Sequence, residues 1–155
     1  MSTAERKEVT PVRQEVGSVV VRFAGDSGDG MQLTGGQFTQ ATALAGNDLA
    51  TFPDFPAEIR APAGTTFGVS SFQINFGARA IKTSGDEPDT LIAMNPAALK
   101  VEVENLKAGG LLVVDIGSFT RRNLRKAGFE DSPLEDDSLS KYQVIEIDIS
   151  RLTLE

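Results

Sequence analysis

The chain has 155 residues, of which 40% are apolar and 24% charged, and this length is enough for one domain with its own core. Its formal net charge of −7 makes it too acidic to favour nucleic acid or an anionic membrane as the main partner. No stretch approaches the roughly 18 apolar residues of a membrane span, and we expect a cytoplasmic protein. The sequence contains neither Cys nor His, which excludes thiolate ligation of an iron–sulfur cluster and removes the commonest general base, so we expect no catalytic and no metal-ligating residue.

The N-terminal segment, residues 1–16, is polar and mixed in charge, without the apolar core of a signal peptide. We interpret it as a flexible tail that precedes a single α/β domain at residues 17–155. The domain begins with an apolar run from Val19 to Phe23, whose β-branched residues are typical of a buried strand.

A helix is predicted directly after the glycine-rich loop that follows this strand. Asp29 fits the N-cap position, and Gln32 lies three residues later, which is the spacing of a capping box. Gly46 is suited to the C-terminal end. The expected buried face of the helix comprises Met31, Thr34, Phe38, Ala41 and Ala45.

The remaining elements follow in alternation. Strands are predicted at residues 49–52, 69–76, 91–94, 111–114 and 142–147. Asn95 and Pro96 are typical of an N-cap and a first helical residue. Ser118 is expected to cap a short basic helix that extends to about Ala127.

Alternating strands and helices favour an α/β fold with an open, mainly parallel, twisted sheet and helices on both faces, as in Rossmann-like domains. Only eight residues, ending in "SRLTLE", follow the last predicted strand, although such a strand is normally covered by a helix. Either this segment begins a helix or another chain covers that face, and we expect the domain to continue past Glu155.

The loop within "RFAGDSGDGMQLTGGQ", residues 22–37, does not match a known phosphate-binding motif. Gly25 and Gly30 have Walker A spacing, but Met31 and Gln32 stand where Lys and Ser or Thr are required. The dinucleotide fingerprint also fails, because the spacing is G-x-x-G-x-G, although Asp54 could imitate its ribose-binding acid.

Two aspartates in this loop decide against a phosphate cradle, since a carboxylate beside a phosphate costs about 1–4 kcal/mol at surface dielectrics. One interpretation is a tight turn, in which glycines supply positive φ and the aspartates organise the backbone. The other is a ligand site that offers Ser27 and backbone amides to a polar group other than phosphate. The candidate residues in the loop are Gly25, Asp26, Ser27, Gly28, Asp29 and Gly30.

Three further segments should converge with this loop outside the carboxyl ends of the strands. The first is the proline-containing segment at residues 53–64, whose Glu58 and Arg60 we assign to ligand binding. The others are Asn95 with its proline, and residues 115–118. A basic run at residues 121–126 could meet phosphates, but it is also typical of a solvated helix face.

Four segments, in this order and spacing, carry a family resemblance: "RFAGDSGDGMQLTG", "FPAEIRAPAGT", "GVSSFQI" and "MNPAALK". With them the chain resembles the N-terminal region of the alpha subunit of 2-oxoacid:ferredoxin oxidoreductases, most closely the 2-oxoglutarate type. That region is the gamma domain of the family, which is a separate subunit in some members and fused to alpha in others.

The resemblance implies a reaction in which a 2-oxoacid and coenzyme A give acyl-CoA, CO₂ and reduced ferredoxin. It implies that this domain binds and positions coenzyme A, with Gly25 to Gly30, Glu58, Arg60 and Asn95 as site residues. Thiamine diphosphate, Mg²⁺ and [4Fe-4S] clusters would lie on other domains or subunits. The implied partners are the rest of the alpha subunit, the beta subunit, and ferredoxin as electron acceptor.

Two other functions stay open at this stage. The domain could be a structural interaction module whose loops bind only partner chains. A stand-alone dinucleotide-dependent reductase subunit is the third hypothesis, and the absence of the dinucleotide fingerprint disfavours it.

Overall fold

The computed structural model describes residues 13–26, 28, 30–55 and 68–154. Of the predicted tail, residues 13–16 have no regular secondary structure, and residues 1–12 lie outside the described part. The strands and α-helices are, in chain order, β1 (Ser18–Asp26), α1 (Met31–Leu44), β2 (Asp48–Asp54), β3 (Val69–Gly77), β4 (Thr90–Ala93), α2 (Pro96–Glu102), β5 (Leu111–Asp115), α3 (Arg121–Lys126), β6 (Gln143–Ile147) and α4 (Ile149–Leu152). Short 3₁₀ turns η1 (Val103–Asn105), η2 (Ile116–Ser118) and η3 (Asp137–Leu139) lie between them.

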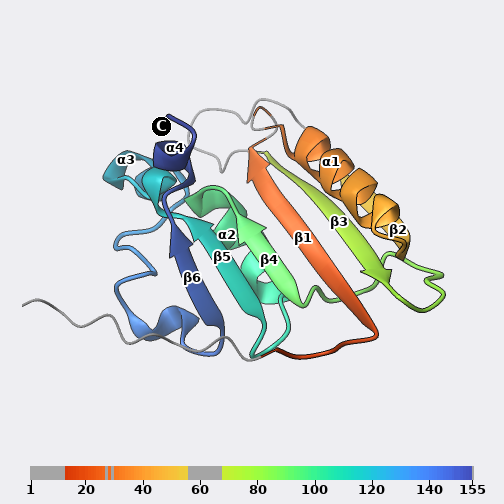
Figure 1. Ribbon diagram of the computed structural model, residues 1–155. Helices are drawn as coiled ribbons and strands as arrows, with labels where there is room; N and C mark the ends of the chain where they lie inside the picture. Colours follow the sequence, from red (N-terminus) through yellow and green to blue (C-terminus); the bar gives the residue numbers. More distant parts are fainter. Residues whose placement is uncertain (1–12, 27, 29, 56–67, 155) are drawn as a thin grey trace, which may run out of the picture.

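The strands form one six-stranded sheet in the order β2-β3-β1-β4-β5-β6 (Figure 1). Strands β1, β4, β5 and β6 pair in parallel, whereas β3 pairs antiparallel with both β1 and β2. The predicted open α/β sheet is confirmed, and it is mixed. Strands β1 and β2 are both antiparallel to β3 and so run in the same direction, joined by the crossover through α1; the exception is β3, which returns between them, and no local pattern signals this.

Helices cover both faces of the sheet, as predicted. Helix α1 packs over β1, β3 and β2, where Met31 belongs to a buried cluster with Phe23 and Ile74. Helix α2 packs on the opposite face, where Leu99 joins a second cluster around Leu112. We refer to these two sides as the α1 face and the α2 face; the α1 face is toward the viewer in Figure 1.

The buried stripe of α1 is rotated from the predicted one. It consists of Met31, Gly35 and Thr42, with Phe38 partly buried. The predicted members Thr34, Ala41 and Ala45 are exposed. The physical reason is Gly35, because a Cβ at this position would lie 2.2 Å from the Phe72 ring. The missing side chain lets α1 approach β3 along this stripe.

The start of α1 also differs from the prediction. The N-cap is Gly30, with φ 71° and no side-chain hydrogen bond, rather than Asp29. The Gln32 amide donates to Ser70 Oγ at 3.1 Å and to the Ser71 carbonyl at 2.9 Å, so it connects the first turn of α1 to β3. At the other end, Gly46 has φ 84° and follows the helix as predicted.

The chain after β6 turns into the short helix α4, whose N-cap Asp148 accepts a hydrogen bond from Arg151 N at 3.0 Å. Of the two alternatives given for this segment, the structure therefore shows the first, since a helix begins here. Within the described residues, no helix combines the length and apolarity that crossing a membrane requires.

Candidate functional site

A cavity of about 280 Å³ opens at the carboxyl end of the sheet, beside β1. Strand β1 has a parallel neighbour on one side and an antiparallel neighbour on the other, so the cavity lies where the topology changes, as ligand sites in open α/β sheets commonly do. Its walls are formed by Asp26, Gly68, Val69, Asn95, Pro96, Ala97, Ser118, Asn123 and Lys126. Residues from three of the four segments predicted to converge therefore meet here.

The glycine loop contributes Asp26, the last residue of β1, to this cavity. Gly30 has the positive φ that we predicted for the loop glycines, whereas Gly28 does not. Ser27 and Asp29 lie outside the described residues, as do Glu58 and Arg60 in the fourth segment. Their assignment to ligand binding stays a prediction.

Asn95 follows β4 and starts α2, as predicted. Its Oδ1 accepts a hydrogen bond from Ala98 N at 2.8 Å, and Pro96 is the first helical residue. The structure thus confirms the cap and places Asn95 in the cavity wall. A direct contact with a ligand stays a prediction.

The cap can be tested separately from any ligand role. Asn95→Ala should lower the free energy of unfolding by about 1 kcal/mol, because the Ala98 N–H loses its acceptor. Asn95→Asp should leave stability nearly unchanged, since Asp caps a helix about as well as Asn. Urea denaturation measures both; an equal loss in the two variants would contradict the capping role.

Asp115 at the end of β5 organises the neighbouring wall. Its side chain is 3% exposed and accepts hydrogen bonds from Gly117 N at 3.2 Å, Ser118 Oγ at 3.0 Å and Ile149 N at 3.0 Å. The carboxylate therefore joins η2 to α4, and Ser118 is the residue of this segment that lines the cavity.

Helix α3 closes the cavity with Asn123 and Lys126. The cap of α3 is Thr120, which accepts from Asn123 N at 3.3 Å, so the prediction that Ser118 caps this helix is wrong. Instead, the Ser118 carbonyl accepts from Asn123 Nδ2 at 2.8 Å. Among the described residues of the cavity wall, Asp26 is the acidic one and Lys126 the basic one.

The other cations of the basic run face elsewhere. Arg121 and Arg125 line a second hollow between α3 and β6. The acidic residues of that hollow are Glu130, Asp131, Glu135 and Glu146. With four carboxylates against two guanidinium groups, this hollow is a poor site for phosphate. Among the described residues, no cluster of three or more His, Cys, Asp or Glu could hold a metal ion.

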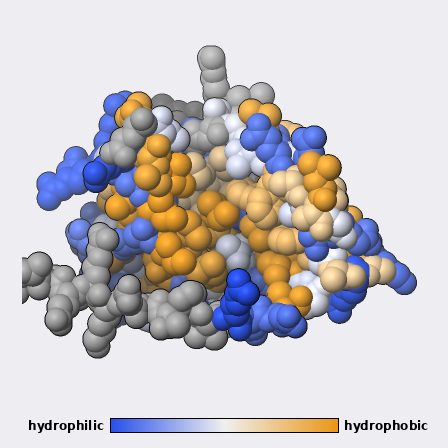
Figure 2. Space-filling view, in the orientation of Figure 1, coloured by the Kyte–Doolittle hydropathy of each residue, from blue (hydrophilic) through white to orange (hydrophobic). Residues whose placement is uncertain are grey.

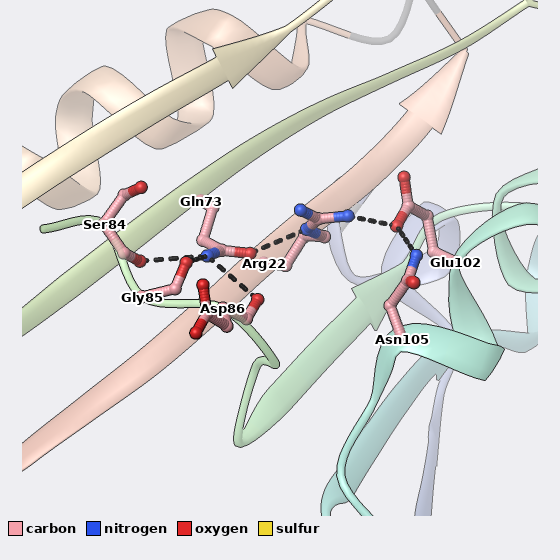
Figure 3. A network of polar contacts seen from close by, with 7 residues as sticks. All are labelled: Arg22, Gln73, Ser84, Gly85, Asp86, Glu102 and Asn105. Atoms are coloured by element: carbon pink, nitrogen blue, oxygen red, sulfur yellow. Dashed lines mark hydrogen bonds and ion pairs between the residues drawn. The ribbon is translucent and has the colours of Figure 1, made fainter.

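A second polar centre, which the sequence analysis missed, lies on the α2 face of β1 (Figure 3). Arg22 forms an ion pair with Glu102 at the end of α2 and donates from Nε to Gln73 Oε1 at 2.9 Å. Gln73 Nε2 donates to the carbonyls of Ser84 at 2.9 Å and Gly85 at 2.8 Å. The network therefore joins β1, β3, α2 and the loop before β4.

One signal in the sequence could have pointed to this network. Arg22 interrupts a run of apolar residues in a strand, which indicates a paired charge on a buried face. Its partner Glu102 is 80 residues away, so no local pattern identifies it.

Comparisons with known proteins agree on one family. The family model for pyruvate ferredoxin/flavodoxin oxidoreductase matches residues 20–155. The chain is 58% identical over 144 residues to the 2-oxoglutarate oxidoreductase subunit KorA of Mycobacterium tuberculosis. The match covers 93% of this chain and 22% of the relative, so the chain spans about a fifth of that subunit's length.

Solved structures show the same fold. The 2-oxoglutarate:ferredoxin oxidoreductase of Magnetococcus marinus, with 2-oxoglutarate, coenzyme A and succinyl-CoA bound, superimposes with a TM-score of 0.69 at 25% identity, over 90% of this chain and 21% of that one. The pyruvate oxidoreductase subunit PORC of Thermotoga maritima gives a TM-score of 0.59 at 19% identity, over 90% of this chain and 66% of that one. The keto/oxoacid ferredoxin oxidoreductase gamma subunit of Geobacter sulfurreducens gives a TM-score of 0.59 at 20% identity, over 86% of this chain and 62% of that one.

Proposed function

Because the chain belongs to the pyruvate ferredoxin/flavodoxin oxidoreductase family, we propose that it is the gamma-type domain of a 2-oxoglutarate:ferredoxin oxidoreductase. The reaction would convert a 2-oxoacid and coenzyme A into acyl-CoA and CO₂, with ferredoxin as the electron acceptor. The domain would bind and position coenzyme A and support assembly with the remaining alpha-subunit domains and the beta subunit. The relatives named as 2-oxoglutarate enzymes support this choice of substrate.

The cavity beside β1 is the observation that carries the proposal. At about 280 Å³ it is smaller than the ~300–1,000 Å³ of sites that hold a whole drug-sized ligand. It therefore suits one arm of coenzyme A, and its Ser118 and Asn123 match the amides of the pantetheine arm. Asp26 disfavours a phosphate inside the cavity, whereas Lys126 favours the phosphates at its rim.

Redox chemistry would be supplied by other parts of the enzyme. An iron–sulfur cluster needs thiolate ligands, and these 155 residues contain no Cys. The side chains present here do not fit a cluster site, and we assign them no step that passes through a cluster or through thiamine diphosphate. The contribution of this chain is to hold and orient the acyl acceptor.

Titration with coenzyme A tests the proposal. Lys126→Ala should weaken binding by about 10- to 100-fold, because it removes a charge-assisted contact to phosphate. Arg122→Ala is the matched control, since Arg122 is exposed on the same helix and lines neither hollow. Calorimetry on the purified chain should show an affinity change for Lys126→Ala alone.

Each alternative function predicts a different result in the same titration. Binding of NAD(P)H in place of coenzyme A would favour the reductase hypothesis, and binding of neither ligand would favour a purely structural module. Equal losses in the two α3 variants would contradict the position proposed for the phosphates. The chain alone should reduce no viologen when it is given 2-oxoglutarate and coenzyme A, and measurable reduction would contradict the division of chemistry.

A further inference from the structure

The cavity beside β1 carries polar side chains, in contrast to the surface over the strands on the α1 face, where apolar side chains gather and hydrophilic ones lie around them (Figure 2). It opens at the carboxyl end of the sheet, and its wall includes Asp26, Ser118 and Asn123. Which of these groups donate hydrogen bonds and which accept them decides what kind of ligand group the cavity can hold.

The hydroxyl group of Ser118 has a fixed direction. Its Oγ lies 3.0 Å from Asp115 Oδ2, and an ionised carboxylate can only accept hydrogen bonds. The hydroxyl proton is therefore donated to Asp115. Because a serine hydroxyl has a single proton, only the lone pairs of Ser118 Oγ remain for a ligand, and lone pairs can only accept.

The Asp115 carboxylate cannot reverse this arrangement. The residue is 3% exposed, and its Oδ1 accepts from Gly117 N at 3.2 Å and from Ile149 N at 3.0 Å. Backbone N–H groups can only donate, so Oδ1 is fixed as an acceptor and the orientation of the carboxylate is fixed with it. Oδ2 accepts from the hydroxyl groups of Ser118 at 3.0 Å and of Ser150 at 3.4 Å.

Two further side chains of the wall also favour a donor on the ligand. Asn123 Nδ2 donates to the Ser118 carbonyl at 2.8 Å, which fixes the orientation of the amide and leaves Asn123 Oδ1 as an acceptor. Asp26 is acceptor-only when ionised, and a carboxylate can accept several hydrogen bonds at once. The wall therefore carries acceptors from β1, η2 and α3, whereas its basic residue, Lys126, is exposed.

We propose that Ser118 recognises an amide N–H of the pantetheine arm of coenzyme A, with Asp115 as the positioning residue that keeps the serine hydroxyl an acceptor. The inference rests on the proposed function, which places this arm in the cavity. Each amide group of the arm offers one N–H donor. A site that accepts from an N–H rejects an analogue without it, because the acceptor is then left without a partner.

Oxygen analogues of coenzyme A test this contact directly. In each analogue an ester oxygen replaces the N–H of one pantetheine amide, so that the shape is kept and the donor is lost. Titration calorimetry on the purified protein should show that one analogue binds about tenfold more weakly than coenzyme A. In Ser118→Ala this difference should fall below about threefold, because the partner of the N–H is gone. The analogue that responds identifies the amide that Ser118 contacts.

Asp115→Asn should reverse the polarity of Ser118 while the shape of the wall is kept. The new amide oxygen serves the two backbone N–H groups, so its NH₂ group lies beside Ser118 Oγ and donates to it. The hydroxyl proton is then directed into the cavity, where it meets the N–H of the ligand. Coenzyme A should bind at least about tenfold more weakly, and its advantage over the responding analogue should fall below about threefold.

Ser150→Ala is the matched control for these variants. It removes a hydroxyl from the same carboxylate oxygen, but Ser150 is not among the described residues of the cavity wall, so the affinity for coenzyme A should change by less than about twofold. Urea denaturation checks that each variant is folded, and if Asp115→Asn is not, the comparison of Ser118→Ala with Ser150→Ala still decides.

The titrations separate failure of the inference from failure of the proposed function. Absence of coenzyme A binding by the unmodified protein would contradict both. If coenzyme A binds, the inference alone is overturned when neither analogue loses affinity, when the loss is the same in Ser118→Ala as in the unmodified protein, or when Ser118→Ala and Ser150→Ala have equal effects.

Discussion

Arg22→Met is expected to lower the free energy of unfolding by about 3–5 kcal/mol, because it leaves the Glu102 carboxylate buried without its cation. The side chains of Arg22 and Glu102 are 14% and 6% exposed, so solvent cannot replace the guanidinium. Gln73 also loses the Arg22 Nε–H donor to its side-chain oxygen. Urea denaturation monitored by circular dichroism measures the loss.

The double variant Arg22→Met/Glu102→Leu should recover much of this stability, because two apolar side chains replace a buried ion pair at little net cost. Lys107→Met is the surface control. Lys107 pairs with Asp89 at 2.9 Å, but the two side chains are 47% and 38% exposed, and we expect a change below about 1 kcal/mol. An Arg22→Met effect no larger than that of Lys107→Met would show that the network of Figure 3 contributes little to stability.

Gly35→Ala and Gly36→Ala are expected to change stability in opposite directions, although the two glycines are neighbours in α1. A Cβ at Gly35 would lie 2.2 Å from the Phe72 ring, whereas a Cβ at Gly36 meets nothing within 4 Å. Gly35→Ala should therefore cost about 1–3 kcal/mol through overpacking, even after the gain in helix propensity. Gly36→Ala should gain about 0.5–1 kcal/mol from propensity.

Thermal and urea unfolding of these two variants give the sign directly. Gly35→Ala should also disturb the contact between α1 and β3, which a changed Phe72 side-chain signal in NMR spectra would report. If both variants stabilise the protein, then α1 does not approach β3 as closely as the structure shows, and the rotated buried stripe is incorrect.

The elements that form the proposed coenzyme site could be located from the sequence, but the way they pack together could not. The loop after β1 and the Asn95–Pro96 cap were identifiable, because glycines and capping residues act on their immediate neighbours. The participation of Lys126 and Asn123 follows from the way α3 packs against η2. That packing depends on Asp115, whose partners include Ile149, 34 residues later in the chain.

Features that are set by residues close together in the chain could be predicted from the sequence. Apolar runs located all six strands, and Asn95 with Pro96 located the start of α2, because strand periodicity and helix capping are set within a few residues. The motif order in the chain indicated the oxidoreductase family, which the comparisons confirm.

Features that depend on residues far apart in the chain could be seen only in the folded protein. The antiparallel β2–β3 pair, the partner of Arg22 and the rotation of α1 onto Gly35 all depend on contacts between residues far apart in the chain. The choice of the α2 face for helix α2 has the same origin: β4 and β5 are apolar on both sides, and nothing in their residues says which side receives the crossovers. That choice follows from the direction in which successive strands are added, because a right-handed connection then has only one face available.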